Sequence, residues 1–182
     1  GNEGFPPLKI TGAELTRNEI SLPGNVSSQY ISALLMIGPV LKQGLRLSLT
    51  GEIISRPYID LTLQLMKRNG ADAEWTSSNV LEVKPQPYRP TPYYIESDWS
   101  AASYWYAFAA LMPDVVLRLP DLYKDSLQGD ARVAELFSQL GVNTTYHESY
   151  VGLTRTSACV SELTNDFTNQ PDLAQTFVVT CA

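Results

Sequence analysis

An internal repeat constrains this chain of 182 residues more than any other feature of its sequence. Gly70 and Gly141 lie 71 positions apart, and each follows a predicted helix where a left-handed helix stop belongs. Ser55 and Ser126 are also 71 positions apart, and each lies in a loop before a predicted helix. Three copies of one supersecondary unit, the last incomplete, explain this register, although loosely similar spacings can occur in any α/β protein.

Apolar periodicity assigns the elements inside each copy. Alternation predicts strands at 45–49 and 115–119, and helical spacing predicts helices at 27–41, 57–69, 99–112 and 130–140. Shorter strands are expected at 71–75, 80–83, 142–146 and 152–154. Each copy should therefore read strand, helix, strand, helix, strand, strand, which is an α/β (α+β) fold of βαβαββ units. Residues 30–37 are apolar nearly all round, so we expect that helix to be buried on every side.

The charge balance and the scarcity of metal-binding side chains limit the chemistry. Thirteen basic and nineteen acidic residues give a net charge of −6, whereas a nucleic-acid binder normally carries a basic patch. Cys159, Cys181 and a single histidine, His147, cannot build a disulfide framework or a His/Cys zinc site. His147 is expected at the surface, and no Gly-rich nucleotide fingerprint occurs. We therefore expect no metal and no cofactor, and chemistry carried by hydroxyls, amides and carboxylates.

The termini and the apolar runs bear on location. The first residues have neither the basic nor the apolar region of a signal peptide, and the longest apolar runs are too short to cross a bilayer. We expect a cytoplasmic protein without membrane contact. The chain starts without Met and stops in an apolar stretch without a helix stop, so we expect a fragment.

The segment 23–30, Pro-Gly-Asn-Val-Ser-Ser-Gln-Tyr, is the most informative loop. Free backbone N–H groups, the positive end of the helix dipole and the hydroxyls of Ser27 and Ser28 make an anion site that suits phosphate. Gly24 would permit close backbone approach. The structural alternative is that Ser27 only caps the helix and Ser28 is a first-turn residue, and the segment taken alone favours that alternative.

Two further loops place polar groups at helix starts. Ser55 either caps the helix that follows or joins the same anion site, and Tyr58 either belongs to the core or lies against an apolar face of a ligand. Asp172 is by default an N-cap, but it could also orient a substrate hydroxyl or take its proton. The same choice arises for Asp130, where the structural role is preferred.

Five segments together resemble the 5-enolpyruvylshikimate-3-phosphate synthase family, and they cover essentially the whole chain. Their order and spacing are those of the family, which is far more specific than any one of them. The segments are 24–36 (GNVSSQYISALLM), 51–60 (GEIISRPYID), 98–104 (DWSAASY), 126–130 (SLQGD) and 171–172 (PD).

The resemblance implies a reaction and a set of site residues. The reaction is transfer of the carboxyvinyl group of phosphoenolpyruvate to the 5-hydroxyl of 3-phosphoshikimate, with release of phosphate, in the shikimate pathway to chorismate and the aromatic amino acids. The family is also the target of glyphosate. It implies no cofactor, and the full-length enzyme is expected to be monomeric.

By resemblance, Ser27, Ser28 and Ser55 bind the phosphate of 3-phosphoshikimate. Gln29 reaches both substrates, Tyr58 lies against the shikimate ring, and Asp172 binds its hydroxyls as the candidate general base.

The resemblance also implies an architecture, the inside-out α/β barrel of the enolpyruvyl transferases, incomplete in this chain. Two lobes each hold three βαβαββ units whose helices lie inside and point their N-termini towards the cleft. By resemblance, residues 1–122 belong to the N-terminal lobe, 123–129 cross between the lobes, and 130–182 are an incomplete part of the C-terminal lobe.

Other functions remain as alternatives. A UDP-N-acetylglucosamine enolpyruvyl transferase would use the same chemistry on a nucleotide sugar, although the Ser-Ser-Gln and Ser-Arg-Pro-Tyr segments fit it less well. An RNA 3′-phosphate cyclase shares the unit, but the acidic charge and the lack of its histidine context oppose it. The last alternative is a non-catalytic binding module built on the same repeat.

Overall fold

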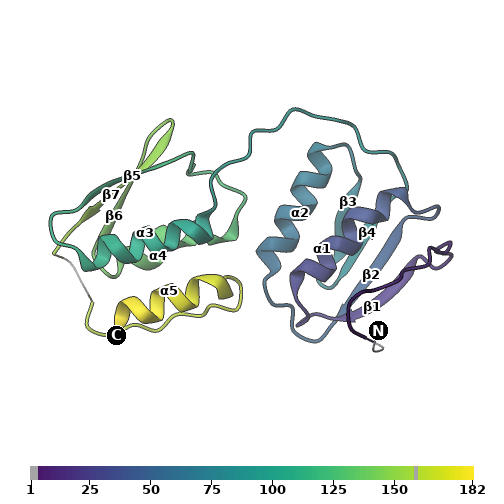
Figure 1. The fold of residues 1–182 in the computed structure, drawn as a ribbon, viewed down its shortest axis with the longest axis horizontal. Coiled ribbons are helices and arrows are strands. Elements are labelled where there is room, and N and C mark those ends of the chain that lie inside the picture. Colours follow the sequence, from purple (N-terminus) through teal and green to yellow (C-terminus); the bar gives the residue numbers. More distant parts are fainter. Residues whose placement is uncertain (1–3, 158–159) are drawn as a thin grey trace.

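The computed structural model describes residues 4–157 and 160–182, so Cys159 lies outside the described residues. Two α/β units lie next to each other and are joined by a long extended segment, residues 84–98 (Figure 1). The first unit contains a four-stranded sheet of order β1-β2-β4-β3, in which β1 and β2 are parallel and the other pairs antiparallel. Its elements are β1 (Glu19–Pro23), α1 (Ser28–Ile37), η1 (Gly38–Val40), β2 (Leu45–Thr50), α2 (Arg56–Arg68), β3 (Ala73–Ser77) and β4 (Val80–Val83).

The second unit repeats this arrangement with one strand fewer among the described residues. Its sheet has the order β5-β7-β6, with both pairs antiparallel. The last helix, α5, lies beside α3 (Figure 1), where the hydroxyls of Ser103 and Thr176 are 3.0 Å apart. Its elements are α3 (Trp99–Leu111), β5 (Val116–Pro120), η2 (Gly129–Arg132), α4 (Val133–Ser138), β6 (Val142–Tyr146), β7 (Tyr150–Arg155) and α5 (Pro171–Cys181).

The alternation read from the sequence is confirmed in β2. Leu45, Leu47 and Leu49 are buried, whereas Arg46 faces solvent, because successive side chains of a strand point to opposite faces. The buried leucines pack with Ile31, Leu35, Ile59 and Leu63 of the two helices that cover the sheet, so each unit encloses its own core.

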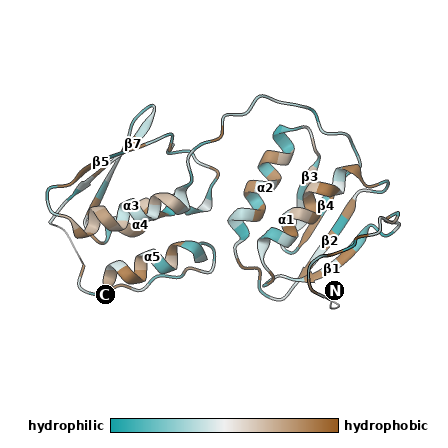
Figure 2. Ribbon diagram, viewed as in Figure 1, coloured by the Kyte–Doolittle hydropathy of each residue, from teal (hydrophilic) through white to brown (hydrophobic). Residues whose placement is uncertain are grey.

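The second core is rich in aromatic residues. Trp99, Tyr106, Phe137 and Phe177 are buried there, and the rings of Phe137 and Phe177 meet edge to face with centroids 5.5 Å apart. Hydrophobic residues run along α5 in Figure 2, because Leu173 and Phe177 of that helix complete this core. The helix that opens near Asp172 therefore packs as part of the second unit in this chain.

The second copy departs from the predicted order at its first strand. Residues 84–98, which precede α3, form no strand in the described chain. They include four prolines, at 85, 87, 90 and 92. Proline lacks the N–H that a β-ladder requires, so this segment stays extended without joining either sheet.

The expectation that residues 30–37 are buried on every side was wrong. Ile31 and Leu35 are fully buried against the sheet, but Tyr30 is 68% exposed and Met36 51% exposed. The reason is that α1 covers one face of a single sheet, and α2 packs along one of its flanks. Its apolar outer side consequently faces solvent here.

The fold class is confirmed as α/β, built from partial sheets that do not close. None of the helices among the described residues is long and apolar enough to cross a membrane. The two cores separate within residues 84–98. The division into lobes at residues 123–129 stays a prediction.

Candidate functional site

The loops that precede α1 and α2 lie against each other. The N–H of Gly24 donates to the carbonyl of Thr50 at 2.7 Å, and the N–H of Ile54 donates to the carbonyl of Gly24 at 3.2 Å. A Cβ atom at Gly24 would lie 2.6 Å from the carbonyl oxygen of Glu52, closer than real contacts allow. Glycine is therefore needed here for the two helix starts to sit side by side.

The predicted phosphate-binding residues of the first loop stand at the start of α1. Ser27 occupies the N-cap position, and its Oγ accepts a long hydrogen bond of 3.4 Å from the N–H of Gln29. The capping alternative is thus present in the structure, but a bond of this length is weak. Ser28 is half-buried in the first turn, whereas Ser27 and Gln29 are exposed. The hydroxyls and the amide consequently stand at the positive end of the helix dipole.

Ser55 is held in an unusual backbone conformation at the start of α2. Its φ of 57° is left-handed, and the residue is only 7% exposed. Among the described residues its side chain makes no capping hydrogen bond, while its N–H donates to the carbonyl of Thr168 at 2.9 Å. The capping role considered for Ser55 is therefore not observed.

The hydroxyl of Tyr58 joins the two units. It lies 2.7 Å from Oδ2 of Asp130 and 3.1 Å from Oδ2 of Asp172. The hydroxyl of Ser100, in the first turn of α3, also reaches Oδ2 of Asp130. We call Tyr58, Ser100, Asp130 and Asp172 the junction cluster. Side chains from four segments far apart in sequence therefore converge where the helices begin.

Burial sets the electrostatics of the junction cluster. Asp130 is 1% exposed, and this burial raises the pKa of its carboxyl above the ordinary value, opposed by the hydrogen bonds from Ser100 and Tyr58. The negative charges of Asp172 and Asp98 raise the same pKa further. Burial is also the first cause that raises the pKa of Tyr58, followed by its hydrogen bond to Asp130. Tyr58 therefore keeps its proton at neutral pH.

Asp172 is not the N-cap of α5, so the default prediction for this residue was wrong. Gln170 occupies the N-cap position, Pro171 opens the helix, and Asp172 stands one residue further in. Its carboxylate is exposed and faces Tyr58, in contrast to the buried Asp130. An exposed carboxylate beside a fixed hydroxyl can accept a hydrogen bond from a ligand hydroxyl or take its proton.

The predicted site residues fall into two neighbouring groups. Ser27, Ser28 and Gln29 stand at the start of α1, and the contact of Gly24 with the loop before α2 brings them near the second group. Ser55, Tyr58 and Asp172 are linked by hydrogen bonds across the two units, directly or through the loop at Thr168. No three His, Cys, Asp or Glu side chains of residues 4–157 and 160–182 form a group that could hold a metal ion.

A family model described as EPSP synthase (3-phosphoshikimate 1-carboxyvinyltransferase) matches residues 1–182. The chain belongs to the EPSP synthase family. It is 64% identical over 181 residues to a Bacteroides fragilis 3-phosphoshikimate 1-carboxyvinyltransferase, covering 100% of this chain and 44% of that protein. A protein of the same name from Idiomarina loihiensis is 39% identical over 178 residues, which are 97% of this chain and 41% of the relative. The chain thus spans less than half the length of these relatives.

Solved structures of EPSP synthase and of a related transferase support the fold. EPSP synthase from Acinetobacter baumannii superposes with a TM-score of 0.67 at 19% identity, over 98% of this chain and 40% of that chain. The enolpyruvyl transferase NikO from Streptomyces tendae gives a TM-score of 0.50 at 16% identity, over 79% of this chain and 35% of that chain. At such identities the likeness concerns the fold alone. The fold expected from the sequence is confirmed.

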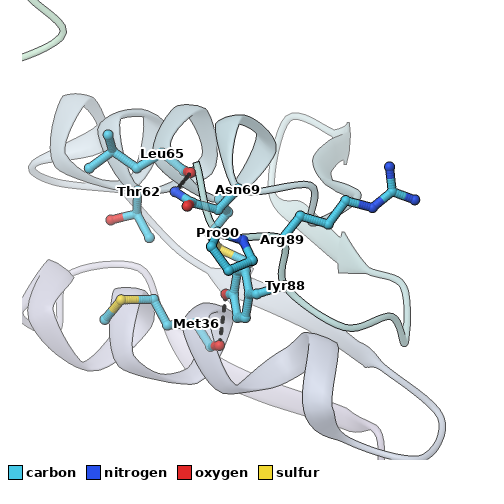
Figure 3. A pocket seen from close by; sticks show the side chains of 8 residues that line it. Met36, Thr62, Leu65, Asn69, Tyr88, Arg89 and Pro90 are labelled. Carbon is cyan, nitrogen blue, oxygen red and sulfur yellow. Dashed lines mark hydrogen bonds between the residues drawn. The ribbon is translucent and has the colours of Figure 1, made fainter. Parts of the chain in front are cut away.

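An apolar cavity in this EPSP synthase family chain lies away from the helix starts. Its volume is about 420 Å³, and it is lined at the C-terminal ends of α1 and α2 by Met36, Asn69 and Tyr88 among others (Figure 3). Two of its polar side chains bond to the backbone, Tyr88 to the carbonyl of Met36 at 2.9 Å and Asn69 to that of Leu65 at 2.9 Å. The side chain of Arg89 points away from the other lining residues (Figure 3).

Two members of the junction cluster in this EPSP synthase family chain are not predicted as contacts by the sequence. The pattern around Asp130 favours a structural role, and nothing in the sequence marks Ser100 as a contact. The signal that could have found Asp130 is the repeat, because it places the loop of Ser126 at the position of the loop of Ser55. Equivalent loops of neighbouring units open at the same ends of their helices.

Proposed function

We propose that the protein containing this chain transfers the carboxyvinyl group of phosphoenolpyruvate to the 5-hydroxyl of 3-phosphoshikimate, with release of phosphate. The observation that carries this proposal is the family match over residues 1–182, together with 64% identity to a protein named for that activity. The reaction belongs to chorismate and aromatic amino acid biosynthesis. The cytoplasmic location and the monomeric state of the full-length enzyme remain predictions.

The start of α1 is proposed to bind the phosphate of 3-phosphoshikimate. Ser27 and Ser28 supply hydroxyl donors there, and the first N–H groups of the helix supply fixed dipoles. Ser55, from the adjoining loop, is proposed to complete the set, since its side chain makes no capping bond within the described residues. Donors already fixed in place lose little entropy when an anion binds.

The other polar residues are proposed to act on the ring and the reacting groups. Gln29, exposed in the first turn of α1, is proposed to reach both 3-phosphoshikimate and phosphoenolpyruvate. The ring of Tyr58 is proposed to lie against the carbocycle. Asp172 is proposed to bind ring hydroxyls and to accept the proton of the 5-hydroxyl as its oxygen bonds to C2 of phosphoenolpyruvate. As that bond forms, the C2–C3 double bond breaks and C3 takes up a proton, which gives a tetrahedral adduct. Loss of phosphate from C2 and of a proton from C3 would then restore the double bond and complete the transfer.

Phosphate release by a full-length protein that carries this sequence tests the proposal. Release is expected only when 3-phosphoshikimate and phosphoenolpyruvate are both present. Calorimetric titration with 3-phosphoshikimate and, separately, with UDP-N-acetylglucosamine identifies the acceptor. Binding of the nucleotide sugar alone would replace the proposal with the related transferase activity, and binding of neither would favour a non-catalytic module.

A further inference from the structure

The hydroxyl of Tyr58 has one proton and two carboxylate neighbours. It lies 2.7 Å from Asp130 and 3.1 Å from Asp172. A single O–H makes one strong hydrogen bond, and the shorter distance favours Asp130. When the proton points to Asp130, the lone pairs of the tyrosine oxygen face the exposed carboxylate of Asp172.

The surroundings of Asp130 favour a Tyr58 proton that points to Asp130. Three other elements face its carboxyl: α2 with Tyr58, α3 with Ser100 and the preceding Asp98, and α5 with Asp172. The residue is 1% exposed, and its Oδ1 has no hydrogen-bond partner in the described chain. A buried carboxylate without a full set of donors depends strongly on those it has, since an unsatisfied buried charge is costly.

Arg132, the one basic residue of η2 and α4, bonds to partners other than Asp130. Arg132 donates to the carbonyl of Asp166 at 3.2 Å and to Gln170 at 3.1 Å, and its Nε lies 3.7 Å from Glu135. Arg132 is therefore engaged by other partners, and among the described residues the hydroxyls of Tyr58 and Ser100 are the donors to Asp130.

We propose that Asp130 is a positioning residue that draws the Tyr58 proton inward, so that the Tyr58 oxygen and the Asp172 carboxylate stay open as acceptors for substrate hydroxyls. This inference rests on the proposed function and adds a residue to it. Without Asp130 the tyrosine proton turns to Asp172 and occupies the acceptor that the substrate hydroxyl needs.

The inference predicts an unusual pattern in a pair of variants of a full-length protein that carries this sequence. Asp130→Ala should lower kcat by about tenfold or more, because the misdirected proton must be displaced from Asp172. Tyr58→Phe removes that proton, so the double variant should recover about fivefold relative to Asp130→Ala alone. If Asp130→Ala acted only by disturbing the packing, its loss of kcat would instead add to the loss caused by Tyr58→Phe. As a matched control, Ser103→Ala, a buried change between α3 and α5, should combine additively with Tyr58→Phe.

Asp130→Asn keeps an acceptor oxygen of the same size and serves if the alanine variant does not fold. Its kcat should stay within about fivefold of the wild type, because the amide oxygen still accepts the tyrosine proton. A folded Asp130→Asn variant slowed by about a hundredfold, or additive losses in the Asp130→Ala and Tyr58→Phe pair, would overturn the inference. Additive losses with an active wild type overturn this inference alone. A wild type without turnover of 3-phosphoshikimate overturns the proposed function and the inference with it.

Discussion

The backbone N–H of Ser55 donates a 2.9 Å hydrogen bond to the carbonyl of Thr168. This bond ties the loop before α2 to the loop before α5, which come from different units. Asp166 holds the receiving loop in shape by accepting from the N–H of Thr168 at 2.8 Å and from its hydroxyl at 2.6 Å. The left-handed conformation of Ser55 is thus stabilised from the other unit.

Asp166 should stabilise the chain in a pH-dependent way. The hydrogen bonds from Thr168 hold the pKa of its carboxyl below the ordinary value. Its contribution is therefore present above the unfolded pKa and is lost as pH falls through the lowered folded pKa. Urea unfolding should find Asp166→Asn less stable than the wild type near neutral pH, with a gap that closes in acid. A gap that stays constant into acid would contradict this account.

The pH dependence of stability that Asp130 causes should have the opposite sign to that of Asp166. Burial raises the pKa of its carboxyl in the folded chain, so between the ordinary value and the raised one the folded state binds more protons than the unfolded state. Stability then falls as pH rises through that window. The free energy of unfolding of Asp130→Asn, minus that of the wild type, should increase with pH across it. A difference that decreases would mean that the carboxyl is not buried as described.

Gly24 should resist substitution although it lies in a loop. A methyl group at this position would meet the carbonyl of Glu52, so Gly24→Ala should destabilise the chain by about 1–3 kcal/mol, measured by urea unfolding. The matched control is Gly12→Ala, which meets nothing within 4 Å and should change stability by less than about 0.5 kcal/mol. Equal effects of the two substitutions would show that the loops do not pack as described.

Ser28→Ala tests the proposed phosphate site in a full-length protein. Loss of a hydrogen bond to a charged group should weaken binding of 3-phosphoshikimate by about 1–3 kcal/mol in calorimetry. Ser149→Ala, an exposed change in the turn between β6 and β7, is the control and should leave the dissociation constant unchanged. An unchanged constant for Ser28→Ala would remove this hydroxyl from the site.

The chain by itself is expected to show no measurable transferase turnover. Its proposed site residues are hydroxyls, an amide and carboxylates, and the net charge of −6 opposes two multiply charged anions. Phosphate release by the isolated chain, above that of a Tyr58→Phe control, would refute this prediction.

The elements that alternate cleanly could be predicted from sequence. The pattern of β2 and the stops at Gly70 and Gly141 depend on local rules, and both glycines have the predicted left-handed conformation. The burial of residues 30–37 could not be predicted, since an apolar helix surface shows how much it could bury but not whether a neighbour covers it. The repeat predicts a strand before α3, whereas the four prolines of residues 84–98 already oppose one.

The site was predictable as a set of loops but not as a set of contacts. Helix starts with hydroxyls and carboxylates can be found in a sequence. Of the predicted residues, Tyr58 and Asp172 meet across the units, and Ser55 bonds to the other unit through Thr168. That Tyr58 reaches Asp130 depends on how two separate cores sit together, which no local pattern encodes. The roles of these residues in binding and catalysis stay predictions.

The proline-containing segment 84–98 leaves both hydrophobic cores complete on either side of it. Tyr58 lies in the unit of the first core, whereas Asp130 and Asp172 lie in the unit of the second. The contact of Tyr58 with the two carboxylates therefore depends on how the two units are oriented, and neither unit makes it alone. A substitution far from every polar group would abolish this contact if it rotated one unit against the other, even where both cores keep their stability.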